Sequence, residues 1–379
     1  MDIGLYIHVP FCRTRCHFCA FYLRIHREDQ ARMYLESLAR EIQLSAALHS
    51  LGGRRLDSVY IGGGTPTTLR PDQLCSILDL ARNYLGVLEG AEVTLEAHPD
   101  SVTLEGLRRL ACAGFNRISF GVQSLDDGEL VRIGRRTPSE SARVAVALAR
   151  TAGFVNINLD LMYGLPGQTP ESWLSTLEQA IALEPTHLSC YALTIEDGTR
   201  LQVDIRRGEP VEPNAALQNA MEDDAVRRLA KAGFERYEIS NFSRAGYACR
   251  HNLHYWRGED YLGLGPSAQS YLNGCRFGNV EDLEAYHRAL EAGRAPVAER
   301  AYLSPEQCRR EAVVFGLRLI EGINVAALRS GAESGELLHE WDRTLHRLRD
   351  QGLVEERTGW ISLTDLGRRF ADSVAVELM

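Results

Sequence analysis

Residues 5–19 read Leu5-Tyr6-Ile7-His8-Val9-Pro10-Phe11-Cys12-Arg13-Thr14-Arg15-Cys16-His17-Phe18-Cys19. A β-branched and aromatic run is followed directly by three cysteines at C-x3-C-x2-C spacing. The run predicts a buried strand, and the spacing places three soft ligands on the loop that leaves this strand. This arrangement suits an iron–sulfur cluster, and three thiolates would leave one iron of a cubane open to a small molecule.

Two other interpretations of these cysteines stay open at this point. A zinc site usually takes a fourth ligand from a second Cys or His pair; His8 and His17 are close in sequence, but the chain has no second C-x-x-C. The cysteines can also be small buried hydrophobes, as free cysteines often are. We favour the cluster, because the rest of the chain supports it.

The composition is typical of a globular protein. The chain has 379 residues, 45% of them hydrophobic and 25% charged, which is enough for one large domain and a smaller one. A net charge of −9 gives no basic footprint, so we expect neither nucleic acid nor anionic membrane as the main partner. The sequence shows neither a membrane-spanning run nor a secretory signal, and it has an odd number of cysteines, nine. We therefore expect a cytoplasmic protein in a reducing compartment.

Apolar runs alternate with amphipathic segments as far as about residue 193. The expected strands are Tyr6–Val9, Ser58–Ile61, Glu92–Ala97, Arg117–Val122, Val155–Met162 and His187–Leu193. The expected helices are Asp29–Leu48, Pro71–Tyr84, Thr103–Ala113, Pro138–Ala152 and Pro170–Leu183. This βα rhythm predicts the α/β class, with a parallel barrel or part of one.

Polar residues follow several of these strands, and such strand ends meet at one mouth of a barrel. They are the cysteine loop, the turn Gly62–Gly64, Glu96, Gln123 and Asp160. Each has a structural alternative: the glycines can be a plain tight turn, Glu96 can cap a helix or pair with Arg117, and Gln123 and Arg135 can lie on the surface. Adjacent glycines also let backbone approach a charged ligand closely. The joint placement favours a cofactor site.

Several stretches together resemble the oxygen-independent coproporphyrinogen III oxidase-like family of radical S-adenosylmethionine (SAM) proteins. The match covers nearly the whole chain, and the motifs are specific jointly rather than singly. They are Tyr6–Cys12, Cys16–Cys19, Ile61–Thr67, Arg117–Ser124 and Asp160–Thr169.

The resemblance implies a partial (β/α)6 TIM-type barrel with a [4Fe–4S] cluster held by Cys12, Cys16 and Cys19. The open iron of such a cluster binds SAM, whose cleavage yields a 5′-deoxyadenosyl radical. By the same resemblance, Tyr6 and Phe18 would line the SAM pocket, and Gly64 and Thr65 would contact the methionine part of SAM. The remaining polar groups of SAM would be bound by Glu96, Gln123, Arg135 and Asp160.

A later segment resembles the heme chaperone branch of this family. The stretches Tyr237–Phe242 and Cys249–Trp256 are similar to its HNxxYW element, which makes His251 the implied axial ligand of a heme. The implied partners are SAM, heme or another porphyrin, and a heme-acceptor protein. Without the resemblance, His251 reads as a histidine with satisfied hydrogen bonds in a loop rich in glycine and aromatic residues.

Two positions differ from the pattern of this family and affect the expected activity. The decarboxylating oxidases carry a further cysteine where this chain has Phe21, so coproporphyrinogen dehydrogenase activity is not expected. The heme chaperones usually carry an acidic residue where this chain has Ala20. The expected function is therefore heme binding and delivery, with a radical SAM enzyme as the alternative: a methyltransferase or cyclopropanase that uses two SAM molecules, or an oxidase-type enzyme.

The tail predicts a separate small module. Amphipathic helices over 304–321 and 336–351 are followed by two short strands over 352–356 and 360–363 and a helix from Thr364, which indicates a winged-helix-like α+β domain. Acidic residues beside the wing weaken a DNA-binding interpretation. The expected domains are 1–240, a radical SAM partial barrel; 241–300, a heme-chaperone-like loop and linker region; and 301–379, the winged-helix-like domain.

Overall fold

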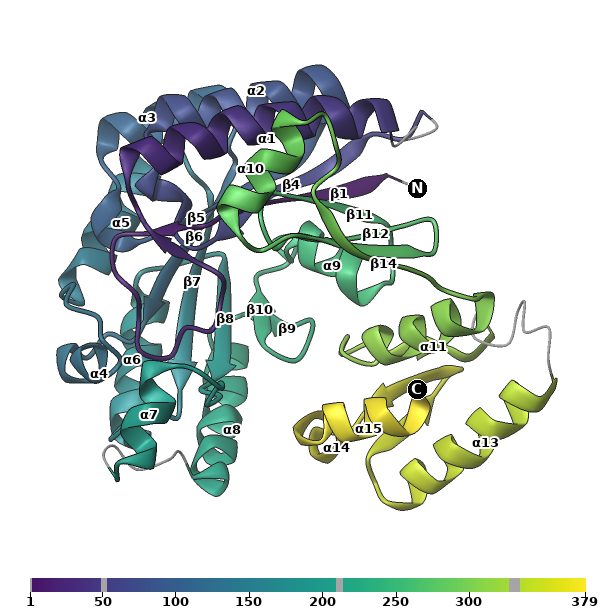
Figure 1. Ribbon diagram of the computed structural model, residues 1–379. Helices are drawn as coiled ribbons and strands as arrows, with labels where there is room; N and C mark the ends of the chain where they lie inside the picture. The colour runs from purple at the N-terminus through teal and green to yellow at the C-terminus, as the bar shows by residue number, and fades with distance from the viewer. Residues whose placement is uncertain (1, 49–52, 209–213, 327–334) are drawn as a thin grey trace.

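The protein is described by a computed structural model that covers residues 2–48, 53–208, 214–326 and 335–379 (Figure 1). Its main body is built on a 12-stranded sheet with the strand order β14-β13-β12-β11-β1-β4-β5-β6-β7-β8-β10-β9. The centre of this sheet is parallel. Its parallel strands are β11 (Tyr261–Leu264), β1 (Ile3–Val9), β4 (Leu56–Gly63), β5 (Val87–Ala97), β6 (Arg117–Gln123), β7 (Asn156–Tyr163) and β8 (His187–Ala192).

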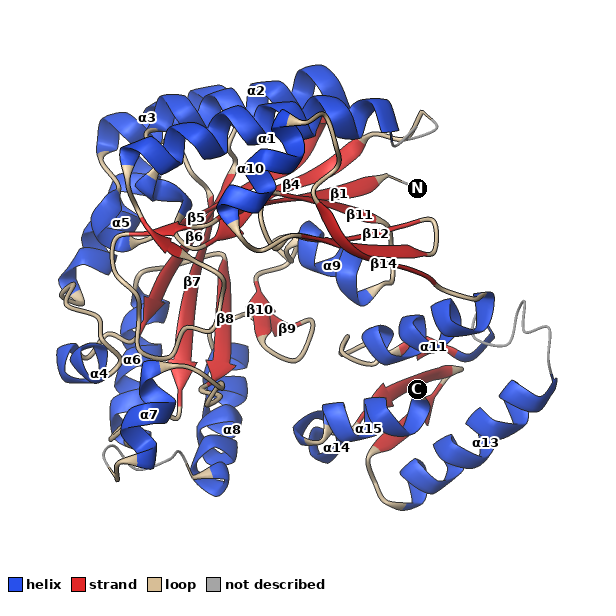
Figure 2. Ribbon diagram, in the orientation of Figure 1, coloured by secondary structure: helices blue, strands red, loops and turns tan. Residues whose placement is uncertain are grey.

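Helices cover the outer face of the curved sheet (Figure 2). They are α1 (Glu28–Leu48), α2 (Pro71–Leu85), α3 (Leu104–Ala113), α5 (Glu140–Thr151), α6 (Pro170–Ala182) and α8 (Ala215–Lys231). The short helices α4 (Asp127–Arg132) and α7 (Arg200–Arg206) lie instead beside the cysteine loop, where His17 forms backbone hydrogen bonds with Ile133 and Leu201. Strands β14 and β9 lie at opposite ends of the strand order, so the sheet is an open, partial barrel. The predicted α/β class and partial barrel are confirmed. Across the described residues, every helix falls short of the length and apolar character that a bilayer crossing demands.

Local sequence sets the helix boundaries. The side chain of Thr103 accepts a hydrogen bond from the Gly106 amide at the start of α3, and Gly114 ends that helix in the left-handed conformation. Thr169 and Ser172 form a capping box at the start of α6, where Pro170 is the first helical residue. These signals explain why the βα rhythm is legible in the sequence.

The two faces of the parallel sheet differ in character. Apolar strand residues such as Leu5, Ile61 and Leu159 are fully buried in the main hydrophobic core, which they share with the outer helices. The alternate positions carry buried polar groups, among them Ser58, Thr94, Arg117, Ser119, Asn158, His187 and Ser189. Because successive side chains point to opposite faces of a strand, these polar groups share the inner face. The barrel interior is thus a polar space that a charged cofactor can occupy.

The segment 241–300 contributes to the main sheet. Helix α9 (Arg250–Trp256) leads into β11, a parallel strand beside β1 that the sequence did not reveal because Tyr261–Leu264 is short and Gly-interrupted. Beyond β11 on this side of the sheet lie β12 (Gln269–Leu272), β13 (Cys275–Asn279) and β14 (Val297–Tyr302), and helix α10 (Leu283–Glu291) connects the last two. Strands β10 (Asn241–Ser243) and β9 (Glu235–Arg236) form the opposite edge of the sheet, beyond β8. The division of the chain at 240 and 300 stays a prediction.

The C-terminal part has its own apolar core, which includes Trp341, Leu348 and Ile361. A three-stranded sheet with the order β15-β17-β16 packs with the helices there. The elements are α11 (Pro305–Gly316), β15 (Ile323–Asn324), α13 (Gly335–Asp350), β16 (Val354–Arg357), β17 (Trp360–Leu363), α14 (Asp365–Arg369) and α15 (Ala371–Leu378). The two strands of the predicted wing and the Thr364 cap are present, and β15 is an addition.

A buried carboxylate joins α1 to the β11–β13 region. Glu41 is 3% exposed and accepts hydrogen bonds from Tyr286 Oη at 2.6 Å, the Gly265 amide at 2.7 Å and Asn279 Nδ2 at 2.5 Å. Burial raises the pKa of Glu41 to about 7, although these hydrogen bonds lower it in part.

The folded state therefore holds the Glu41 proton more tightly than the unfolded chain, where the pKa of a glutamate is about 4.3. As the pH rises from 5 to 8, the wild type should lose about 3 kcal/mol of unfolding free energy relative to Glu41→Gln. Denaturant titrations at several pH values measure this difference, with the exposed Glu89→Gln as the control. If the difference in unfolding free energy between the wild type and Glu41→Gln does not change with pH, the raised pKa of Glu41 is contradicted.

Candidate functional site

The cysteine loop leaves the C-terminal end of β1. Its first cysteine, Cys12, lies in the short strand β2 (Phe11–Cys12), which pairs in parallel with β3 (Arg24–Ile25) and so closes the loop at its base. Cys12 is 8% exposed, whereas Cys16 and Cys19 are partly exposed. One thiol therefore lies in the protein interior, and two lie nearer to the mouth of the barrel.

The three thiols influence one another electrostatically. Burial raises the pKa of the Cys12 thiol to about 11, and the neighbouring Cys19 and Cys16 add to the rise. The Thr65 hydroxyl lies 3.4 Å from Cys12 Sγ, and this contact and the charge of Arg135 favour the thiolate and lower the pKa. Burial also raises the pKa of Cys19. Neighbouring thiols of this kind lose their protons when a metal binds to the sulfur atoms, so the donor set suits iron.

A single metal ion and a cluster place different demands on the positions of their ligands. Within the residues that the structure describes, no three His, Cys, Asp or Glu side chains converge as the ligands of one metal ion do. The ligands of a zinc ion all lie about 2.0–2.3 Å from one point. Each thiolate of a cubane binds a different iron, so its ligands stand around the cluster.

The glycine turn after β4 packs directly on the cysteine loop. The Gly64 amide donates to Val9 O at 2.9 Å, and the Thr65 amide donates to Phe11 O at 2.6 Å. A Cβ on Gly64 would lie 2.6 Å from Phe11 O, a backbone atom that cannot move aside easily. Gly63 adopts a φ of +108°, which favours glycine. The close approach is therefore between two backbone segments, and contact of Gly64 and Thr65 with the methionine part of SAM stays a prediction.

Glu96 lies at the end of β5 on the inner face. It accepts hydrogen bonds from Tyr60 Oη at 2.8 Å and from the Gly63 amide at 3.1 Å. Burial raises its pKa to about 7, with a further contribution from the charge of Asp160. Tyr60 is not among the site residues expected from the sequence. Side chains alternate between the two faces of a strand, so Tyr60, two residues before Gly62, could have been expected on the same face.

Asp160 lies on β7 and faces the same interior. It accepts hydrogen bonds from Ser119 Oγ at 3.1 Å and from Asn158 Nδ2 at 2.8 Å. Burial raises its pKa. Two partly buried carboxylates whose charges repel each other are stabilised by a ligand that brings positive charge or hydroxyl donors. SAM carries a sulfonium, an ammonium and a ribose diol, so the pair fits its chemistry.

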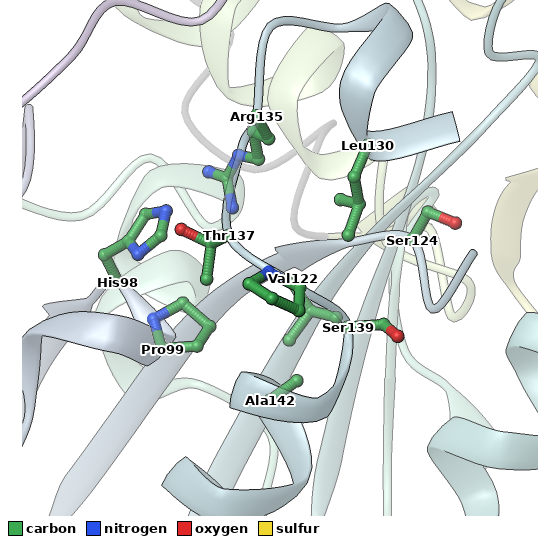
Figure 3. A pocket seen from close by; sticks show the side chains of 10 residues that line it. His98, Pro99, Val122, Ser124, Leu130, Arg135, Thr137, Ser139 and Ala142 are labelled. Atoms are coloured by element: carbon green, nitrogen blue, oxygen red, sulfur yellow. The ribbon is translucent and has the colours of Figure 1, made fainter. Parts of the chain in front are cut away.

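Arg135 and Gln123 lie near the end of β6. The guanidinium of Arg135 donates from Nη1 to Gly121 O, while its buried Nε finds no partner among the described residues. Gln123 has a φ of +70°, where the β6–β7 register shifts, so its side chain leaves the regular strand direction. Arg135 and His98 line a cavity of about 10 Å³, which holds about one water molecule (Figure 3). The unpaired donor of Arg135 suits a carboxylate.

The two aromatic residues expected at the pocket lie in different surroundings. Tyr6 is half-buried on the inner face, with its ring centroid 6.1 Å from that of Tyr60, and desolvation and the charge of Glu96 raise its pKa. Phe18 instead packs against a second apolar cluster. That cluster consists of Leu130, Ile133, Met162, Leu165, Leu193 and Leu201. Tyr6 thus joins the Glu96 group, whereas the place of Phe18 beside SAM stays a prediction.

His251 lies at the opposite end of the barrel from the cysteines. It is 1% exposed in α9, close to Gly4 at the start of β1, where a Cβ on Gly4 would lie 3.1 Å from its Nδ1. Ser58 Oγ lies 3.1 Å from Nδ1, and Tyr255 Oη lies 2.8 Å from Nε2. Burial lowers the pKa of His251 to about 3, so the ring is neutral. As a heme ligand it would have to exchange one of these hydrogen bonds for iron, and that role stays a prediction.

Comparisons with known proteins agree with this geometry. A family model described as the Radical SAM superfamily matches residues 6–180, and one described as the HemN C-terminal domain matches residues 303–370. A protein named heme chaperone HemW from Mycobacterium tuberculosis is 35% identical over 99% of this chain and 94% of its own length. A Bacillus subtilis protein of the same name is 33% identical over 97% of both chains.

A solved structure of a related protein has the same fold. Coproporphyrinogen III oxidase (HemN) from Escherichia coli, a radical SAM enzyme, superposes with a TM-score of 0.87. It is 26% identical, and the match covers 100% of this chain and 90% of that one. The fold and the cysteine loop thus define a radical SAM protein. Within that superfamily, the chain belongs to the HemW family.

This membership implies a [4Fe–4S] cluster and SAM as cofactors. When bound, the cluster supplies the electron that cleaves SAM. In this chain Cys12, Cys16 and Cys19 would hold the cluster, and Glu96 and Asp160 would orient a cationic ligand.

The first prediction of this site concerns the cluster. Replacing Cys12, Cys16 or Cys19 by Ala should abolish the brown chromophore and the bound iron and sulfide after anaerobic reconstitution, because two thiolates do not hold a cubane. Iron and sulfide analysis measures this, with the exposed Cys112→Ser as the matched control. Full iron and sulfide in all three variants would refute the cluster assignment.

The second prediction separates SAM binding from cluster binding. Glu96→Gln and Asp160→Asn should weaken SAM binding about tenfold or more, since each removes one charged acceptor, while iron content stays at the wild-type level. Anaerobic calorimetry or equilibrium dialysis gives the SAM affinity, and the exposed Glu105→Gln serves as the control. Unchanged affinity in both variants would rule out the carboxylate pair as part of the SAM site.

Proposed function

We propose that this chain binds heme and delivers it to an acceptor protein while it holds a [4Fe–4S] cluster and SAM. The observation that carries the proposal is similarity over almost the full length to proteins named heme chaperone HemW, at 33–35% identity. The segment Arg250–Trp256, with its HNxxYW pattern, lies inside the matched length. In this proposal, SAM is held by Tyr6, Phe18, Gly64, Thr65, Glu96, Gln123, Arg135 and Asp160.

His251 is the proposed ligand of the heme iron, through its imidazole. The Tyr255 hydroxyl lies 2.8 Å from His251 Nε2, so this nitrogen becomes available to iron when the Tyr255 side chain turns away. The odd number of cysteines, nine, agrees with a proposed location in the cytoplasm.

The second candidate is a radical SAM enzyme that acts on a small molecule. The observation in its favour is that the partly buried carboxylates Glu96 and Asp160 both face the barrel interior, where they suit a cationic ligand such as SAM. The decarboxylating oxidases carry a cysteine where this chain has the exposed Phe21, which disfavours oxidative decarboxylation of coproporphyrinogen. Products of SAM cleavage in the presence of a bound substrate would identify this candidate.

The test of the chaperone proposal is an anaerobic heme titration of the cluster-reconstituted protein, followed by the Soret absorbance. We expect stoichiometric binding by the wild type and a lost or shifted Soret band in His251→Ala. The matched control is His346→Ala, whose side chain is 74% exposed in α13 and should bind heme as the wild type does. Absence of specific binding by the wild type would overturn the proposal and favour the enzyme.

A further inference from the structure

A cavity lies between the main body and the C-terminal part of the chain. Its volume is about 180 Å³, and its walls come from α9, from β11 to β13 and from α11. Figure 1 shows α11 running beside α9 and the β11–β14 region. The cavity is partly open to solvent. It lies outside the barrel and is separate from the mouth that carries the cysteines.

The walls of this cavity are aromatic. Trp256 and Phe315 face each other across the boundary between the two parts, with ring centroids 6.4 Å apart. Tyr271 adds a third ring, and its hydroxyl interacts with the thiol of Cys308. Flat aromatic walls favour a flat conjugated ligand, because offset stacking contributes beyond the burial of area.

Basic groups stand beside these rings. The guanidinium of Arg276 lies 5.7 Å from the centre of Phe315, and that of Arg318 lies 4.8 Å from the centre of Trp256. Each is engaged in an ion pair through another nitrogen, Arg276 with Glu311 at 2.7 Å and Arg318 with Asp372 at 3.6 Å. Among the described residues, however, no acceptor reaches the buried Nε of either arginine or Nε1 of Trp256. These donors are suited to the carboxylates of an acidic ligand.

The size of the cavity limits how much of a ligand it takes. An apolar cavity of about 150 Å³ admits benzene, so about 180 Å³ holds one or two five-membered rings and not a whole macrocycle. A tetrapyrrole seated here would leave the rest of its ring outside the cavity. A cargo held in this way can be taken by an acceptor without unfolding its carrier.

The cavity adjoins the proposed iron ligand. Tyr255 lines it, and the hydroxyl of this tyrosine is the group that lies 2.8 Å from His251 Nε2. The Tyr255 side chain therefore contacts both the aromatic cavity and the imidazole. From this geometry we infer that the cavity between α9 and α11 seats one edge of the heme macrocycle, with Arg276 at a propionate. This inference rests on the proposed heme binding and names where the ring lies.

The test uses the full cluster-reconstituted chain and two probes, heme and metal-free protoporphyrin. Ala312 lines the cavity, so Ala312→Trp should fill it and weaken binding of both probes at least tenfold. The control Ala292→Trp places the same side chain at an exposed position after α10 and should leave both affinities unchanged. His251→Ala should weaken heme but not the metal-free ring, because only heme has iron to ligate.

A second measurement needs no variant in the cavity. Saturating protoporphyrin should slow alkylation of Cys308 at least fivefold in the wild type, while the exposed Cys112 on α3 reacts at an unchanged rate. Two results would overturn the inference and leave the proposed function standing. In one, the wild type binds heme and Ala312→Trp binds it equally well. In the other, protoporphyrin binds but does not slow the alkylation of Cys308. A wild type that binds no heme would overturn the proposed function itself.

Discussion

The parallel pairing of β1 with β4 on one side and β11 on the other is the constraint on which the rest of the structure depends. Its register sets Val9 opposite Gly63, so the cysteine loop and the glycine turn leave the sheet side by side. At the other end it sets Gly4 opposite Ser58 and Tyr261, which places α9 against the base of the barrel. One strand of seven residues thus positions both proposed binding regions.

The two regions are connected through the polar interior. Tyr60 donates its hydroxyl hydrogen to Glu96 at 2.8 Å, and its ring lies 5.3 Å from the imidazole of His251 in a stacked arrangement. A ligand that binds Glu96 and a change at His251 therefore act on the same tyrosine. Tyr60 thus contacts both a proposed SAM ligand and the proposed heme ligand.

Much of the main fold could be predicted from the sequence because its signals are local. The apolar strands, the Thr103 and Thr169 caps and the polar residues at strand ends all act within a few residues of where they stand. Strand β11 could not be predicted, since Tyr261–Leu264 is short and pairs with a strand more than 250 residues earlier in the chain. The burial of His251 and the cavity beside α11 depend on tertiary packing, which the HNxxYW pattern alone does not contain.

The central claim is that three thiols of one loop hold a cluster with an iron left open for SAM. Electron paramagnetic resonance of the anaerobically reconstituted and reduced protein tests it most directly, recorded with and without SAM. The account predicts the signal of a reduced [4Fe–4S] cluster whose shape changes when SAM is added, because SAM then binds the open iron. A cluster signal indifferent to saturating SAM, or no cluster signal at all, would contradict it.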